Sequence, residues 1–287
     1  MAADLPRGAA APPSSRRLAG ELAPRIASAV VLAAIALALD YAGVGMFALL
    51  VLAVGAVMSW EWGRVVRRTD FDAMLVVHVA ALSAATGLAA TRQPGLGLLA
   101  VLAGMLVVAL MRRDRSGLVS AAGVAYTGLP AISLVWLRAD EPNGFAAVLL
   151  VFLIVWASDT SAFIVGRTVG GPKLWPRVSP NKTWSGLIGA LVGSASVGAL
   201  FSLVGGIGSA GCLAVEGLIL GLVAQLGDLA ESSLKRGFGV KDASGLIPGH
   251  GGFMDRADSM VAAAVVAALI AAAVSPDEPA RALLLGC

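Results

Sequence analysis

The stretch that decides the fold runs from Gly144 to Val165 and is GFAAVLLVFLIVWASDTSAFIV. A helix that crosses a membrane needs about 20 mostly apolar residues, and this stretch meets that requirement. Similar stretches recur along the chain, in which hydrophobic residues make up 58% and charged residues only 14%. A soluble domain carries roughly 25% charged residues, so water could not solvate this surface. The sequence therefore predicts an all-α, polytopic integral membrane protein.

We expect about nine membrane-spanning helices, because about nine apolar stretches reach the necessary length. They lie near residues 24–40, 43–60, 73–91, 95–111, 117–137, 144–165, 185–206, 210–227 and 258–275. Segment 1–20 is rich in Ala, Pro and Arg without a periodic apolar face, which predicts a disordered cytoplasmic tail. We divide the remainder into 21–140, with the N-terminal and middle helices, and 141–287, with the polar segments that carry the chemistry.

The basic residues of the loops predict how the chain is oriented, because cytoplasmic loops carry an excess of Lys and Arg. Such residues precede the first span and follow the second, fourth, sixth and eighth spans: Arg7, Arg16, Arg17, Arg25, Arg64, Arg67, Arg68, Arg112, Arg113, Arg115, Arg167, Lys173, Arg177, Lys182, Lys235, Arg236, Lys241 and Arg256. The alternate loops hold little beyond Arg92 and Arg138. We therefore expect a cytoplasmic N-terminus, an outer C-terminus, and a polar cavity that faces the cytoplasm.

The first polar segment, from Asp159 to Gly186, holds two candidate features. Asp159 falls inside an apolar span, where an acid is a functional candidate by default. The run Ser179-Pro180-Asn181-Lys182-Thr183 precedes a helix, and helix N-termini favour phosphate groups. This run is a candidate phosphate cradle, with a plain turn that starts the next span as the alternative.

The second polar segment is GDLAESSLKRGFGVKDASGLIPGHGGFMDRAD, from Gly227 to Asp258. If the eighth helix continues into it, residues spaced i, i+3, i+4 and i+7 share one face, and these are Asp228, Glu231, Ser232 and Lys235. Asp255 and Asp258 are one helical turn apart where the last span begins. Carboxylates there are costly near lipid unless they serve a cation or a substrate.

The second segment mixes acids and cations, which points to magnesium and a phosphate-rich substrate. The acids are Asp228, Asp242, Asp255 and Asp258, and the cations are Lys235, Arg236, Lys241 and Arg256. Magnesium prefers a few carboxylates together with substrate phosphate oxygens, and Lys and Arg neutralise charge that develops during phosphoryl or nucleotidyl transfer. The alternative is a solvated loop with ordinary salt bridges. His250, flanked by glycines, is expected near the site, whereas His78 lies in an apolar span where packing is the better explanation.

The spacing of this segment resembles the signature of the phosphatidate cytidylyltransferases, also called CDP-diacylglycerol synthases. The matching pattern is Ser232-x-Leu234-Lys235-Arg236-x4-Lys241-Asp242-x-Ser244-x2-Ile247-Pro248-x-His250-Gly251-Gly252-Phe253-x-Asp255-Arg256-x-Asp258. Ser179-Pro180-x-Lys182-Thr183 and Gly227-Asp228-Leu229 are also similar to that family. Two positions depart from its usual pattern: Ala257 replaces a larger apolar residue, and Ser185 stands where many members have Glu.

The resemblance implies that CTP and phosphatidate react to CDP-diacylglycerol and pyrophosphate in phospholipid biosynthesis. It implies Mg²⁺, with a second cation as an option, held first by Asp228 and Asp255 and secondarily by Asp258 or Asp242. The expected catalytic residues are Lys235, Arg236, Lys241, Asp242, His250 and Arg256. The expected substrate-binding residues are Asp159, Ser179, Pro180, Asn181, Lys182 and Thr183. Further expectations are a bacterial-type plasma membrane, contact with membrane lipids but not nucleic acid, and a homodimer.

Other membrane proteins could carry a similar set of residues. A secondary transporter also buries acids, but it is built from two related halves with broken helices, and the sequence has no such symmetry. A CDP-alcohol phosphatidyltransferase needs paired D-x2-D-G and D-x3-D acids, which do not occur here. A polyprenol or dolichol kinase shares a distant topology and stays open as an alternative at this point.

Overall fold

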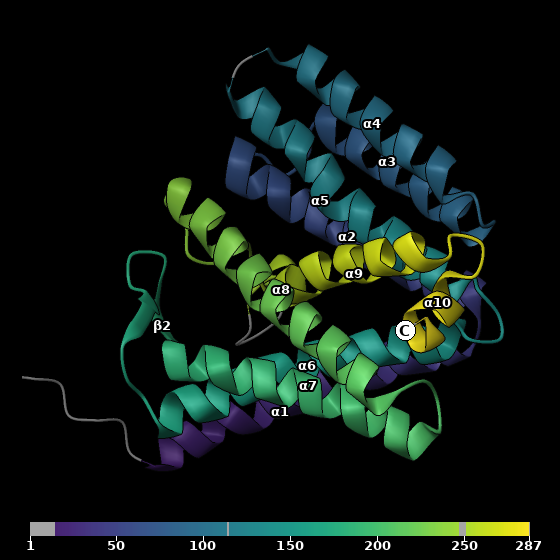
Figure 1. Ribbon diagram of the computed structural model, residues 1–287. Helices are drawn as coiled ribbons and strands as arrows, with labels where there is room; N and C mark the ends of the chain where they lie inside the picture. Colours follow the sequence, from purple (N-terminus) through teal and green to yellow (C-terminus); the bar gives the residue numbers. More distant parts are fainter. Residues whose placement is uncertain (1–14, 114, 247–250, 287) are drawn as a thin grey trace, which may run out of the picture.

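The computed structural model describes residues 15–113, 115–246 and 251–286. These residues form α-helices and one two-stranded antiparallel sheet (Figure 1). The helices are α1 (Ser15–Tyr41), α2 (Val44–Arg67), α3 (Ala73–Ala90), α4 (Pro94–Met111), α5 (Arg115–Arg138), α6 (Gly144–Thr168), α7 (Trp184–Gly205), α8 (Ala210–Gly237), α9 (Met254–Val274) and α10 (Pro279–Leu285). The strands are β1 (Lys173–Trp175) and β2 (Ser179–Thr183).

The described helices confirm the prediction of an all-α, polytopic membrane protein. Eight of them, α2–α9, are long and apolar enough to cross a membrane. In α1 the apolar part, Ser28–Tyr41, is shorter, so the expected total of about nine spans depends on this helix. Helix α1 begins at Ser15, within the segment predicted as a tail, and residues 1–14 lie outside the described part. The apolar pattern did not predict α10, a short helix that packs on α9 and α6.

The helices form two groups that α9 joins. Helices α2–α5 pack on one another, α7 packs on both α6 and α8, and α9 lies against α8 and α5 (Figure 1). Small residues allow close packing within the second group. A Cβ atom on Gly217 of α8 would lie 2.3 Å from the Ser194 carbonyl oxygen of α7. Helix α9 connects the two groups through its contacts with α5 and α8.

Contacts between connections show that the loops are sorted into two ends. At one end, Arg68 donates to the Phe238 carbonyl over 2.7 Å, which joins the α2–α3 and α8–α9 connections. At the other end, Arg92 lies 3.4 Å from Asp140, and Asp140 accepts from the Ala280 amide over 2.8 Å. The hairpin lies at the first end and α10 at the second (Figure 1). This sorting agrees with the alternation of basic residues along the sequence.

Candidate active site

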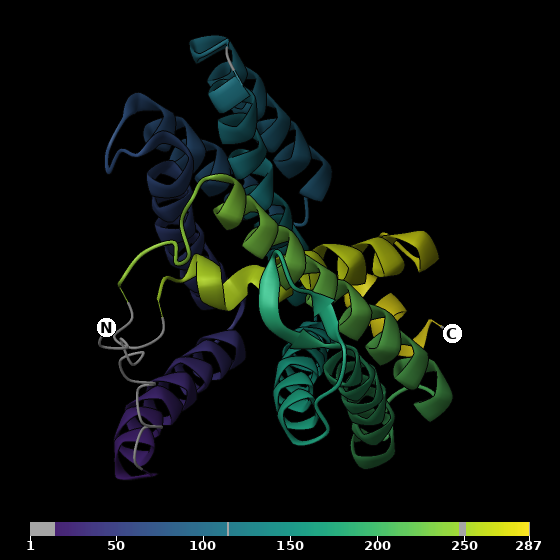
Figure 2. The same ribbon diagram turned by 90° about the vertical axis from the view of Figure 1, so that its left-hand side faces the viewer.

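The last turns of α8 carry one wall of the site. This helix continues to Gly237, beyond the predicted end of its span, so the polar residues that follow Gly227 are helical. Lys235 and Glu231 form an ion pair of 2.7 Å across one turn, and Ser232 donates to Asp228 over 3.3 Å. These contacts confirm that Asp228, Glu231, Ser232 and Lys235 share a face. Seen from the hairpin end (Figure 2), the end of α8, the start of α9 and the hairpin lie on the same side of the molecule.

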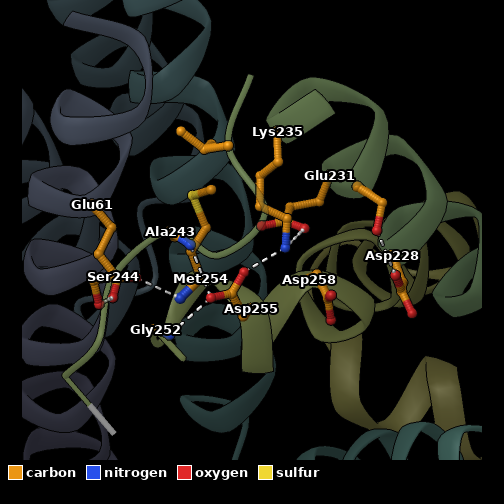
Figure 3. Close-up of polar contacts among 12 residues, drawn as sticks. Glu61, Asp228, Glu231, Lys235, Ala243, Ser244, Gly252, Met254, Asp255 and Asp258 are labelled. Carbon is orange, nitrogen blue, oxygen red and sulfur yellow. Dashed lines mark hydrogen bonds and ion pairs between the residues drawn. The ribbon is translucent and has the colours of Figure 1, made fainter. Parts of the chain in front are cut away.

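Lys235 connects the two helices of the site. Its ammonium group contacts Glu231 on α8 and Asp255 in the first turn of α9 (Figure 3). The side chains of Lys235, Glu231 and Asp255 are 9%, 0% and 6% exposed, respectively. A buried charge without a partner is strongly unfavourable, so each of these groups depends on the others.

Asp255 holds the two sides of the α8–α9 connection together. One of its carboxylate oxygens accepts from Lys235, and the other accepts from the Ala243 amide at 3.0 Å and the Gly252 amide at 2.8 Å. Gly251 has a φ of +82°, and a Cβ atom there would lie 2.7 Å from the Asp255 carboxylate. Glycine is therefore required at this position both by the backbone conformation and by Asp255.

Glu61 of α2 joins the site from the α2–α5 group of helices, although no motif in the sequence singles it out. It is fully buried and accepts from the Ser244 hydroxyl at 2.5 Å, the Phe253 amide at 3.0 Å and the Met254 amide at 2.6 Å. An acid at the end of an apolar span was the signal that could have found it, by the rule that singled out Asp159. Its partners lie too far along the chain for any spacing rule.

A second wall is formed by β2, α6 and the start of α9. Lys182 on β2 lies 2.8 Å from the Asp228 carboxylate and 3.1 Å from the side-chain oxygen of Gln225. Asp159 on α6 accepts from the Gln225 amide over 3.0 Å and from the Ser259 hydroxyl over 3.2 Å. The structure therefore brings together Asp159, Lys182 and Asp228, which come from two separate polar segments of the sequence. Gln225 and Ser259 were missed, because isolated polar residues in apolar helices leave little sequence signal.

The other residues of the predicted phosphate cradle have different positions. The Thr183 hydroxyl accepts from the Gly186 amide over 3.1 Å and caps the N-terminus of α7, which agrees with the plain helix start kept as the alternative. Ser179 is half-buried on β2, and Pro180 and Asn181 are exposed. Lys182 is the member of this run whose contact with an acid of the site is seen.

Four other predicted catalytic residues lie at the surface beside the site. Arg236, Lys241, Asp242 and Arg256 are exposed, and Arg236 donates to the Val240 carbonyl over 3.1 Å. His250, with Ile247, Pro248 and Gly249, lies outside the described residues. The exposed cations leave their charges available to a phosphate-bearing ligand from solution.

The acids of the site fit a divalent cation in chemical type, since carboxylate oxygens are the ligands that magnesium prefers. Asp258 experiences the negative charges of Asp228, Glu231 and Asp159, and one of its oxygens accepts from the Ser259 amide over 2.7 Å. Lys182 and Lys235 neutralise Asp228 and Asp255. Within the described part of the chain, no three ligating side chains are already grouped closely enough to hold a metal. A cation would therefore replace lysine contacts at these carboxylates.

An apolar cavity lies beside the polar residues. It has a volume of about 590 Å³ and opens between the hairpin, α7 and α8. Its lining includes Leu174, Trp175, Trp184, Leu187 and Leu226, together with Gln225. Gln225 is also the partner of Lys182 and Asp159, so the apolar cavity and the charged site share this residue.

Comparisons with known proteins identify similar chains. Residues 23–274 match the cytidylyltransferase family. A protein of Brucella suis biovar 1 (strain 1330) named phosphatidate cytidylyltransferase is 42% identical over 267 residues, which cover 89% of this chain and 95% of that protein. A protein of the same name from Staphylococcus saprophyticus is 39% identical over 162 residues, which cover 55% of this chain and 61% of that protein.

Proposed function

We infer that this chain, which belongs to the cytidylyltransferase family, is a phosphatidate cytidylyltransferase. It transfers CMP from CTP to phosphatidate and forms CDP-diacylglycerol and pyrophosphate. The observation that carries this function is the 42% identity to proteins of that name over 89% of the chain. The family match over residues 23–274 favours this enzyme over the polyprenol kinase and the transporter.

The chemistry requires that a phosphatidate oxygen attacks the α-phosphorus of CTP, while the bond to pyrophosphate breaks. Phosphatidate is already an anion at neutral pH, so a strong general base is unnecessary. The protein must position two anionic reactants and neutralise their charge. Lys182 and Lys235 reach into the site from two walls, where they contact Asp228 and Asp255, respectively. When substrate binds, both lysines contact its phosphates instead of these carboxylates. Arg236, Lys241 and Arg256 at the surface bind the outer phosphates of CTP.

We propose that Mg²⁺ binds among the acids of α8 and α9. Asp228 and Asp258 are the best-placed pair, because a Cβ atom on Gly227 would lie only 2.8 Å from the Asp258 carbonyl, which shows that the helices nearly touch there. To bind the cation, Asp228 gives up its contact with Lys182, and Asp255 joins this set only if it gives up Lys235. When bound, the cation supplies charge neutralisation at the substrate phosphates. Removal of divalent cations with EDTA is expected to abolish turnover, and added Mg²⁺ to restore it.

We further propose that the active site faces the cytoplasm, where CTP is available, in the plasma membrane of a bacterium. The basic connections lie at the hairpin end of the molecule, which supports this orientation. The apolar cavity beside Gln225 accommodates acyl chains of phosphatidate while Lys182 contacts its phosphate. We also propose a homodimer, on the basis of the resemblance to the family.

The decisive assay uses CTP labelled either on the α-phosphorus or on the γ-phosphorus. Purified protein in detergent is incubated with phosphatidate and Mg²⁺, and the lipid fraction is counted. We expect label in lipid only from α-labelled CTP. Transfer of γ-label to a lipid alcohol would instead identify a kinase, and no labelled lipid from folded protein with Mg²⁺ would contradict the proposed function.

A further inference from the structure

Glu61 is a fully buried carboxylate that the proposed reaction does not use. It lies on α2, a helix of membrane-spanning length, where an acid is costly unless it has partners. Its three hydrogen-bond donors, Ser244, Phe253 and Met254, all belong to the signature segment. Figure 3 shows Ser244 and Met254 beside Glu61. A residue of the α2–α5 group thus holds the α8–α9 segment, which carries the chemistry.

Glu61 caps α9 from another helix. The first amides of a helix have no partner within it, and a negative charge near them is favourable. Phe253 precedes α9, and its side chain makes no capping hydrogen bond. Glu61 accepts from the Phe253 and Met254 amides, and Asp255 accepts from the Gly252 amide. The direction of the first turn of α9 is therefore determined by two carboxylates.

The approach of Glu61 explains the second glycine of the His-Gly-Gly run. A Cβ atom on Gly252 would lie 2.3 Å from a carboxylate oxygen of Glu61. Gly252 is not among the described glycines with positive φ, so its backbone conformation is open to other residues. The neighbouring carboxylate, rather than the backbone, therefore favours glycine at this position, because a larger residue would displace Glu61.

We propose that Glu61 is a positioning residue for cytidylyl transfer. Asp255 is the second residue of α9, and Asp258 follows one turn later, so a tilt of the first turn moves both carboxylates relative to Lys235. A displacement of about 1 Å in an active site can cost about 10²-fold in rate. This role rests on the proposed function, because it concerns the rate of that reaction.

The first test compares Glu61→Gln with Glu216→Gln. Glu216 is another buried membrane carboxylate, on α8, and serves as the matched control. We expect Glu61→Gln to lower kcat by about 10- to 100-fold while KM for CTP changes by less than about threefold. Glu216→Gln should keep the wild-type kcat. A Glu61→Gln enzyme with wild-type kcat would overturn the proposal.

The second test uses the close approach of Gly252. In the wild-type background, Gly252→Ala should reduce kcat about as strongly as Glu61→Gln, because the added methyl group displaces the carboxylate. In the Glu61→Ala background, Gly252→Ala should lower kcat little further, because the effects of substitutions at two contacting residues are not additive. Equal effects of Gly252→Ala in both backgrounds would contradict the contact. Ser244→Ala, which removes one hydrogen-bond donor to Glu61, should lower kcat by a smaller factor. This variant supplies the test if Glu61 variants do not accumulate as folded protein.

Hydrogen exchange separates this proposal from the proposed function. In detergent, the amides of Phe253 and Met254 should exchange faster in Glu61→Gln than in the wild type, whether or not either protein is active. Exchange at wild-type rates in Glu61→Gln would overturn the positioning role. Faster exchange in a protein whose wild type does not transfer CMP would instead count against the proposed function alone.

Discussion

Lys235 shows how a single residue supports both the fold and the chemistry. Its ammonium group is shared between Glu231 on its own helix and Asp255 on the next. The i,i+4 spacing to Glu231 is visible in the sequence, because residues four apart lie on one face of a helix. The contact with Asp255 depends on how α9 packs on α8.

Replacing Lys235 by methionine is expected to abolish activity and to lower the melting temperature. It removes the positive charge that neutralises the buried carboxylates of Glu231 and Asp255, and breaking a buried ion pair costs about 3–5 kcal/mol. Adding Glu231→Gln removes one of the uncompensated charges, so the double variant should recover part of the melting temperature without activity. Thermal unfolding in detergent and the CTP assay measure the two effects. A Lys235→Met protein with wild-type activity would exclude the assigned role.

At the scale of elements, the α2–α3 corner illustrates what local sequence determines. Asp72 accepts from the Leu75 amide over 2.8 Å and caps α3, and Arg67 lies 2.6 Å from the same carboxylate. Burial alone would raise the pKa of Asp72, but the hydrogen bonds from Arg67 and Leu75 bring it below the usual value of 3.8. Its charged form therefore stabilises the folded state.

Replacing Asp72 by alanine is expected to destabilise the protein by about 0.5–2 kcal/mol at neutral pH, as for other N-cap residues. Because the folded-state pKa is lowered, the charge-dependent part of this stabilisation is present above the unfolded-state pKa near 3.8 and lost as the pH falls through the folded-state pKa. The difference in free energy of unfolding between variant and wild type should therefore become smaller below pH 3.8. Asp70→Ala, which removes an exposed ion pair, is the control and should cost at most about 1 kcal/mol. A difference that does not change with pH would contradict the role of the charge.

The hairpin, like α10, is an element that the sequence did not predict. Ser179–Thr183 looked like a loop before a helix, but it forms β2 and pairs with β1, with Lys173 opposite Thr183 and Trp175 opposite Ser179. The extension of α8 was foreseeable, because its face of polar residues continues the helical period to Lys235. Strand pairing depends on a partner segment, and β2 is short and of mixed polarity. Its sequence therefore carries a weaker signal for a strand than the polar face of α8 does for a helix.

At the scale of the whole molecule, the two ends of the helical bundle carry different charges and different roles. The basic connections and the candidate site lie at the hairpin end, while Asp140 holds the C-terminal segment at the other. This arrangement supports a cytoplasmic active site and an outer C-terminus.

Fusions to the full-length chain test that orientation. A fluorescent protein at the N-terminus should be bright in a bacterial host, because it folds in the cytoplasm. The same protein at the C-terminus should be dark, and alkaline phosphatase at the C-terminus should be active, because that end is expected outside. A bright C-terminal fusion with inactive phosphatase would contradict the outer C-terminus. It would also require an even number of spans in place of the nine expected.

The sequence by itself determined the membrane fold, the approximate spans, the charge alternation and the residues of the signature. These features are local, since hydrophobic length and helical period are properties of short stretches. Only the tertiary structure decided that Glu61 caps α9, that Lys182 pairs with Asp228, and that Asp159 contacts Ser259. The physical reason is that helix packing brings together residues as far as 193 positions apart, as for Glu61 and Met254, and no local pattern records which helices meet.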